Sequence, residues 1–128
     1  MDFPKDLKYT KEHEWIKVEG NIATVGITDY AQDSLGDVVY VELPQEGASV
    51  TKNEPFGVVE SVKAVSDLYS PISGSINEVN DAIIDNPEVI NEDPYGDAWM
   101  IKVEIHSTNE LADLLSADDY QAFIEEEK

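Results

Sequence analysis

Cysteine and arginine are both absent from this chain of 128 residues. Without cysteine, the protein cannot form disulfides, use a thiolate nucleophile, or hold zinc or iron–sulfur centres through sulfur ligands. Any redox chemistry would therefore need an attached group. No apolar run approaches the roughly 20 residues that a membrane-spanning helix needs, and the first six residues are too acidic for a signal or transit peptide. We expect a cytoplasmic protein, although a mature organellar protein without its presequence fits the same features.

Basic residues are scarce as well. The chain has 28 acidic residues against 8 lysines, which gives a formal net charge of −20. Such a surface repels phosphate backbones and anionic lipids, so neither a nucleic acid nor a membrane surface is expected as a partner. It favours docking onto basic patches of other proteins. Plain solubility or a high-salt environment explains the same acidity, and the composition leaves both interpretations open.

Motifs for catalysis and metal binding are also missing. The two histidines, His13 and His106, lie far apart in the sequence and offer no ligand spacing, so His13 is expected to be structural or solvated. The stretch Asn91–Asp93, which is rich in acidic residues, lacks the ligand spacing and loop glycine of a calcium-binding EF-hand. The sequence contains no phosphate-binding glycine loop and no serine-nucleophile motif. A small hydrolase would need a perturbed carboxylate pair in a deep pocket, and no pattern indicates one.

Short segments of strand-like pattern, separated by turn residues, make up most of the chain. Thr28 is a suitable N-cap for a short helix that ends at Leu35, with Gly36 as the C′ residue. Residues 81–94 are polar and irregular, with a few apolar positions. Many short strands favour a sandwich or barrel, which we expect to form a single domain over residues 1–128. The expected strands cover residues 14–18, 22–27, 37–43, 49–51, 56–59, 65–69, 75–80 and 99–105.

The pattern changes to a helical period after residue 105. Ser107 and Glu110 have the spacing of a capping box at the start of one helix. Ser116 and Asp119 have the same spacing before a last helix. The apolar stripe of that last helix consists of Tyr120, Phe123 and Ile124. We therefore expect two C-terminal helices.

Two of the expected strands, at residues 56–59 and 65–69, are best explained as a hairpin with Lys63 at its tip. Alternation places Phe56, Val58, Glu60 and Val62 on one side of the first strand. A lysine at a tight turn holds its amine in water on a flexible stem. Another enzyme could reach and acylate such an amine, as the attachment site of a carrier protein requires.

The sequence around this lysine resembles that of the glycine cleavage system H proteins. The attachment hairpin of that family is matched by ESVKAVSD at residues 60–67 and by SPISG at residues 70–74. Four further segments also match, and they occur in the same order and with the same spacing as in the family. The resemblance therefore runs from about Leu7 to about Tyr120. The four segments are YTKEHEW at residues 9–15, GITD at 26–29, LGDVVYVELP at 35–44 and PYGDAWM at 94–100.

The resemblance implies a mostly β fold, a flattened antiparallel hybrid of barrel and sandwich like that of lipoyl domains, with a short central helix and C-terminal helices. It implies lipoate bound to Lys63 as an amide. The function implied is that of a carrier without catalysis of its own, which takes the aminomethyl group of glycine from a pyridoxal-phosphate decarboxylase, the P protein. A folate-dependent aminomethyltransferase, the T protein, receives it, and dihydrolipoyl dehydrogenase, the L protein, reoxidises the arm.

The resemblance also assigns roles to three carboxylates. Glu60, three residues before Lys63, is implied to help the lipoate-attaching enzyme recognise the hairpin. Glu14 and Asp67 are implied to lie in a shallow cleft where the loaded arm rests, and where a carboxylate can pair with the cationic amine. The sequence departs from the commonest family pattern at Tyr30, where many members have histidine, and at Ala98, where glycine is usual.

Three alternatives use the same type of hairpin. Biotin carriers usually have methionine on both sides of the lysine, whereas Val62 and Ala64 stand here. The lipoyl domains of 2-oxoacid dehydrogenases usually have aspartate before the lysine and flexible linkers at their ends, and neither is present here. A lipoate relay, which passes its lipoate on to other proteins, needs the same lysine and stays open.

Overall fold

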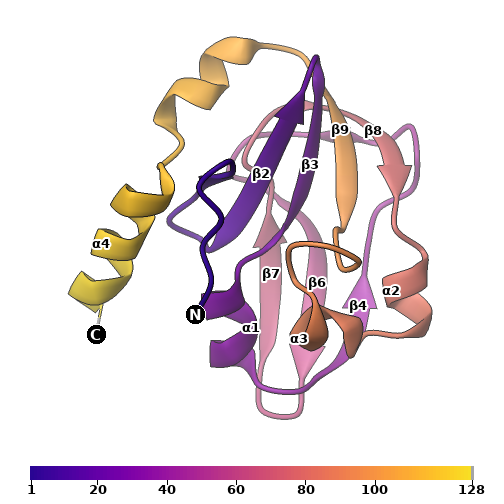
Figure 1. Cartoon of the computed structure of the whole chain (residues 1–128). Coiled ribbons are helices and arrows are strands. Elements are labelled where there is room, and N and C mark those ends of the chain that lie inside the picture. The colour runs from indigo at the N-terminus through magenta and orange to yellow at the C-terminus, as the bar shows by residue number, and fades with distance from the viewer. Residues whose placement is uncertain (128) are drawn as a thin grey trace.

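The computed structural model describes residues 1–127, which form two antiparallel β-sheets with helices at their edges (Figure 1). The larger sheet has the order β1 (Lys8–Tyr9), β2 (Glu14–Glu19), β3 (Ile22–Ile27), β9 (Ile101–Ile105), β8 (Gly74–Val79) and β5 (Ser49–Val50). The smaller sheet has the order β4 (Val38–Glu42), β6 (Pro55–Ser61) and β7 (Val65–Tyr69). The helices are α1 (Asp29–Leu35), α2 (Ala82–Asp85), α3 (Val89–Glu92), a 3₁₀ helix (Thr108–Asp113) and α4 (Ala117–Glu127).

The main hydrophobic core lies between the inner faces of the two sheets. Ile16, Val25 and Val103 of the larger sheet belong to one buried cluster with Val59 and Leu68 of the smaller sheet. Alternating strand residues supply these contacts, as expected for a sandwich. The two sheets remain separate in the described part of the chain. This architecture confirms the predicted fold class, a mostly β hybrid of barrel and sandwich with a central helix and C-terminal helices.

A second apolar cluster attaches α4 to the N-terminal part of the larger sheet. Tyr120 is fully buried there and stacks on Tyr9, with ring centroids 4.9 Å apart and ring planes 8° from parallel. Trp15 and Ile124 belong to the same cluster. The predicted start of this helix is confirmed, because the backbone N–H of Asp119 donates to the hydroxyl of Ser116 at 3.1 Å. No helix described here is both long and apolar enough to cross a membrane.

The capping box predicted at Ser107 and Glu110 is wrong. Ser107 makes no capping bond with its side chain, and a 3₁₀ helix follows it instead of an α-helix. The Glu110 carboxylate accepts hydrogen bonds from the backbone N–H of Ser73 at 2.7 Å and from its hydroxyl at 2.9 Å. Two donors on another segment therefore replace the single local donor of a capping box. The segment 81–94, expected to be irregular, contains α2 and α3 and buries Ile83 and Ile90.

The predicted alternation of β6 fails at its first apolar residue. Phe56 is buried with Val59 in the main core, whereas Val58 is only half-buried. The cause is a β-bulge, because the pairing with β7 shifts between Pro55 and Gly57. One extra residue in a bulge reverses the side on which the preceding residue lies. Phe56 therefore does not share a face with Val58 and Glu60.

Gly26 fits closely against Trp15, its direct partner across β2 and β3. A Cβ atom at Gly26 would lie 2.7 Å from three atoms of the Trp15 indole ring, whose N–H donates to the carbonyl of Pro94 at 2.9 Å. We expect Gly26→Ala to lower the free energy of unfolding by about 2–3 kcal/mol, because overpacking displaces a buried side chain.

Urea unfolding followed by tryptophan fluorescence measures this effect. Gly20→Ala is the control, since Gly20 lies in the turn between β2 and β3 and has open space around the added carbon. Its left-handed φ of 63° alone should cost about 1 kcal/mol. Equal losses in the two variants would contradict the proposed clash with Trp15.

Candidate functional site

The predicted hairpin is present, with the three residues Val62, Lys63 and Ala64 connecting β6 to β7 (Figure 1, bottom). Ser61 closes this loop, because its backbone N–H donates to the carbonyl of Ala64 at 2.8 Å. The Ser61 hydroxyl accepts from the backbone N–H of Lys63 at 3.3 Å and from that of Ala64 at 3.1 Å. The N–H of Val62 donates to the carbonyl of Asp37 at 3.0 Å. The loop is therefore held by backbone hydrogen bonds and by the Ser61 hydroxyl, and none of these bonds uses the lysine side chain.

The Lys63 side chain is exposed and lies beside Gly36, the residue that ends α1. A Cβ atom at Gly36 would lie 3.4 Å from Cε of Lys63, and the φ of Gly36 is 78°, which favours glycine. Within residues 1–127, no group forms a hydrogen bond or ion pair with Nζ of Lys63. The amine is thus accessible to an acyl donor.

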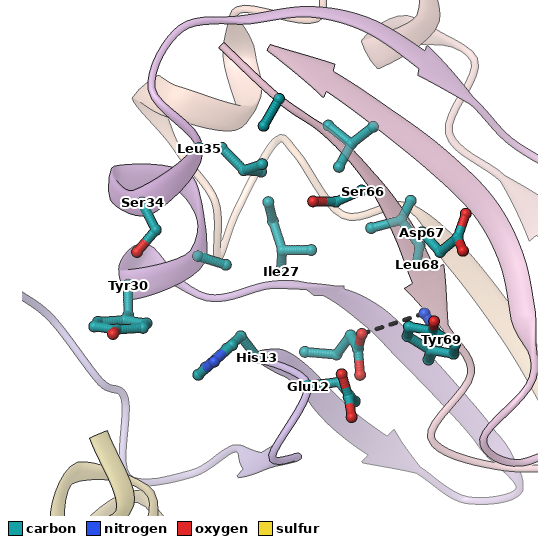
Figure 2. A pocket seen from close by; sticks show the side chains of 14 residues that line it. Glu12, His13, Ile27, Tyr30, Ser34, Leu35, Ser66, Asp67, Leu68 and Tyr69 are labelled. Atoms are coloured by element: carbon teal, nitrogen blue, oxygen red, sulfur yellow. Dashed lines mark hydrogen bonds between the residues drawn. The ribbon is translucent and has the colours of Figure 1, made fainter. Parts of the chain in front are cut away.

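A cleft of about 550 Å³ begins at this loop and runs between α1 and β7 (Figure 2). Ala64 of the loop lines its entrance. Leu35 of α1 and Leu68 of β7 form apolar walls, with Ile27 of β3 between them. Glu14 lines the other end of the cleft. The site therefore joins an exposed amine to a partly apolar groove with a carboxyl group in it.

Glu14 is a buried carboxyl with an unusual acidity. Its side chain is 2% exposed, and its two oxygens accept from the Thr10 hydroxyl at 2.7 Å and from the backbone N–H of Tyr69 at 3.3 Å, the bond dashed in Figure 2. Burial raises the pKa of Glu14 from 4.5 to about 8, against the lowering effect of these hydrogen bonds. Glu12 raises the pKa slightly further. Glu14 is therefore largely protonated at neutral pH.

Asp67 lies at the rim of the same cleft, but its side chain points outward. It is exposed on β7 opposite Val58, whereas its neighbours Ser66 and Leu68 are turned toward the interior. Figure 2 shows the Ser66 hydroxyl and the Asp67 carboxylate on opposite sides of the strand. The structure thus brings Asp67 and Glu14 to one cleft, with only Glu14 inside it.

Glu60 lies outside the cleft, on the outer face of the smaller sheet. It is half-buried and pairs with Tyr40 on one side and Val65 on the other. Tyr40, Val65 and the loop residue Val62 are large apolar side chains that remain exposed. We call these three residues, with Val39, the outer apolar patch. Glu60 is therefore part of the surface that surrounds the lysine loop and not part of the cleft.

Several residues of the cleft were missed by the sequence analysis. Ser66 could have been found from alternation, because it shares a side of β7 with Leu68. Tyr30 and Ser34 come from α1, whose orientation no local pattern specifies. His13 also lines the cleft, in a left-handed conformation with φ of 71°, and its Nδ1 lies 2.8 Å from the Tyr120 hydroxyl. In residues 1–127, no three histidine or carboxylate side chains are grouped as metal ligands.

Fold and site together define a class of small β-proteins that display an exposed lysine on a hairpin beside a cleft. Residues 7–127 match the family model described as glycine cleavage H-protein, and the chain belongs to this family. The glycine cleavage system H protein of Carboxydothermus hydrogenoformans is 60% identical to it over 97% of this chain and 95% of that protein. The protein of the same name from Geobacillus kaustophilus is also 60% identical, over 98% of this chain and 99% of its own length.

A solved structure gives the same result. The crystal structure of a glycine cleavage system H protein from Mycobacterium marinum matches with a TM-score of 0.86 and 43% sequence identity. The match covers 93% of this chain and 96% of that one. The fold comparison therefore agrees with the family model and with the sequence identities.

Proposed function

We propose that this protein is the lipoyl-lysine carrier of glycine cleavage, with lipoate attached as an amide to Lys63. The observation that carries the proposal is the unpaired Lys63 amine at the entrance of a cleft that leads to Glu14. Residues 1–128 would act as a single carrier domain. Its partners would be the glycine decarboxylase, the aminomethyltransferase, dihydrolipoyl dehydrogenase and the enzyme that attaches lipoate.

The dimensions of the cleft support a long acyl group on the lysine. Ala64 lies at the entrance, and the backbone of Tyr69 bonds Glu14 at the other end. Tyr69 follows Ala64 by five steps along the chain, which corresponds to about 16 Å along β7. A lysine side chain alone is much shorter than this distance. An added hydrocarbon chain would reach Glu14 and would contact the apolar walls at Leu35 and Leu68, so the residues present fit lipoate.

When bound, lipoate would supply a dithiolane ring that can take up the aminomethyl group and that dihydrolipoyl dehydrogenase can regenerate from the dithiol once the folate enzyme has removed this group. The chain's own residues hold and protect this cargo. Lys63 tethers the arm, which raises its effective concentration near each partner. Glu14 would pass its proton to the neutral amine of the cargo, and the resulting carboxylate would pair with the ammonium group that forms. Glu60 presents the hairpin to the lipoate-attaching enzyme.

Reconstitution tests this function. The lipoylated protein, mixed with the decarboxylase, the aminomethyltransferase with tetrahydrofolate, and dihydrolipoyl dehydrogenase, should support NADH formation that depends on glycine. The unlipoylated protein is the control and should support none. Equal rates with and without the lipoyl group would contradict the proposal. Deletion of the gene distinguishes a lipoate relay. If the protein serves glycine cleavage alone, the deletion strain should lose only the use of glycine. If it is a relay, growth on other substrates should fall as well, and added lipoate should restore that growth but not the use of glycine.

Asp67 provides a further prediction. Because its carboxylate is exposed at the rim, Asp67→Asn should leave lipoylation intact and speed the loss of the aminomethyl cargo only about twofold, as expected for a screened charge. Release of formaldehyde from the loaded carrier measures the loss. Asp85→Asn, which removes the same charge on α2, is the control. A tenfold effect would mean that Asp67 turns into the cleft when the arm is loaded.

A further inference from the structure

Tyr120 of α4 connects the two sides of the cleft, although it is not among the described residues that line it. Its hydroxyl lies 2.7 Å from the Thr28 hydroxyl and 2.8 Å from Nδ1 of His13. These partners are 92 and 107 residues away in the sequence. The ring itself is fully buried between Tyr9, which stacks on it, and Phe3, which meets it edge-on at 5.5 Å. The position of the hydroxyl is therefore fixed by packing.

Thr28 links Tyr120 to the first side of the cleft. It is fully buried and caps α1, because its hydroxyl accepts from the backbone N–H of Ala31 at 3.1 Å. Its carbonyl accepts from the N–H of Gln32 at 3.1 Å. From α1, the side chains of Tyr30 and Leu35 line the cleft. The orientation of this wall thus depends on the residue that Tyr120 contacts.

His13 links Tyr120 to the second side. It lies next to Glu14 and lines the cleft itself. Its carbonyl accepts from the backbone N–H of Thr28 at 3.1 Å, so the two sides already approach each other at this point. One consistent direction of donation runs from Ala31 through Thr28 and Tyr120 to His13. The chain of hydrogen bonds crosses from α1 to the segment that carries Glu14.

We propose that Tyr120 is a positioning residue of the cleft, which sets the spacing between α1 and the His13–Glu14 segment from outside. Part of this inference rests on the proposed function, since the spacing matters most when a loaded arm lies between the two walls. A loosened wall admits water to the cargo, whereas the Lys63 hairpin, at the far end of α1, keeps its own hydrogen bonds. Loss of the hydroxyl should therefore affect protection and leave attachment unchanged.

The test compares Tyr120→Phe with Tyr9→Phe. Both remove a buried tyrosine hydroxyl from the same aromatic stack, but the Tyr9 hydroxyl donates to the carbonyl of Pro4 and contacts neither cleft wall. In Tyr120→Phe, we expect the backbone N–H groups of Ala31 and Gln32 to exchange with deuterium about 5–10-fold faster, because a hydrogen bond that supports the cap is lost. Tyr9→Phe should leave their exchange within twofold of the wild type.

Lifetime of the cargo is the second readout. The lipoylated and loaded Tyr120→Phe variant should lose its aminomethyl group about 5–10-fold faster, with an unchanged rate of lipoylation at Lys63. Thr28→Ser keeps the hydroxyl and should behave like the wild type in both measurements.

The two readouts separate the two proposals. Hydrogen exchange needs no lipoate, so unchanged exchange of the α1 amides in Tyr120→Phe overturns the positioning role whatever the carrier function. Equal acceleration in Tyr120→Phe and Tyr9→Phe would also overturn it, because the hydroxyl would then act only through general stability. If Tyr120→Phe does not fold, Thr28→Val interrupts the same chain of hydrogen bonds by removing the hydroxyl that Tyr120 contacts. Unchanged exchange of the Gln32 backbone N–H in Thr28→Val would then overturn the positioning role.

Discussion

Replacement of Glu14 by glutamine should make the protein more stable at pH 8 and, at the same time, less able to protect its cargo. Glutamine is nearly isosteric and keeps an oxygen that can accept from Thr10 and Tyr69. It removes the cost of a buried carboxylate. It also removes the buried carboxylate of the cleft, so the cationic amine of the cargo loses its ion pair.

The effect on stability depends on pH in a defined direction. The pKa of Glu14 is raised from 4.5 to about 8 in the fold. The folded state therefore keeps the proton up to about pH 8, whereas the unfolded state loses it above about pH 4.5. The contribution of Glu14 to stability is complete below pH 4.5, declines as the pH rises, and is lost above pH 8. We expect Glu14→Gln to gain roughly 2–5 kcal/mol over the wild type between pH 4 and pH 9.

Urea unfolding of the unlipoylated protein at pH 5, 7 and 8.5 measures this gain. Glu19→Gln is the matched control, because Glu19 is exposed at the end of the same strand and does not line the cleft. Parallel pH profiles for the wild type and Glu14→Gln would contradict the raised pKa. In the loaded carrier, Glu14→Gln should release the aminomethyl group at least about tenfold faster, since a charge-assisted hydrogen bond is lost.

Lys63→Arg should abolish lipoylation and every activity that depends on it. Arginine keeps the positive charge and the length of the stem, but its guanidinium does not form the lipoyl amide. Incubation with lipoate, ATP and a lipoate-attaching enzyme should add one lipoyl group to the wild type and none to the variant, as intact mass will show. Lys17→Arg, at an exposed position of β2, is the control and should be modified like the wild type.

Two other lysines differ from Lys63 because their amines are engaged. Lys52 donates to the carbonyl of Glu110 at 2.7 Å and pairs with Asp113 at 3.2 Å. Lys102 lies 3.7 Å from a Glu78 oxygen and over the ring of Trp99. Acylation of either amine would break these contacts, whereas acylation of Lys63 breaks none. A lipoyl adduct on Lys52 or Lys102 in Lys63→Arg would contradict this argument.

Local patterns predicted the elements around the lysine well. The hairpin was predicted from residues 61–64, which lie between two β-branched runs. The two ends of α1 were predicted from Thr28 and Gly36, and Thr28 accepts from Ala31 as an N-cap should. They failed where a distant partner changed the result. The carboxylate of Glu110 accepts from Ser73 and not from the N-terminus of its own helix. The bulge beside Phe56 depends on pairing with β7.

The cleft was predictable only in part for the same reason. The family resemblance led to Glu14 and Asp67, but sequence alone did not show that one is buried and the other exposed. Burial of Glu14 results from Thr10 and the strand β7 meeting it from both sides. Tyr120 was expected only as an apolar residue of the last helix. Its hydroxyl contacts Thr28 and His13 because α4 folds back over the start of the chain.

The outer apolar patch lies next to the lysine loop, which contains Val62 of the patch. This arrangement has a kinetic consequence. On the proposed function, a partner enzyme that takes the Lys63 arm into its active site would cover Tyr40, Val62 and Val65, and we expect two partners to exclude each other. Each round then requires full dissociation before the next encounter. We expect an excess of any one enzyme to sequester the carrier and slow the others by simple competition, so that turnover of the pathway scales with the molar ratio of carrier to enzymes.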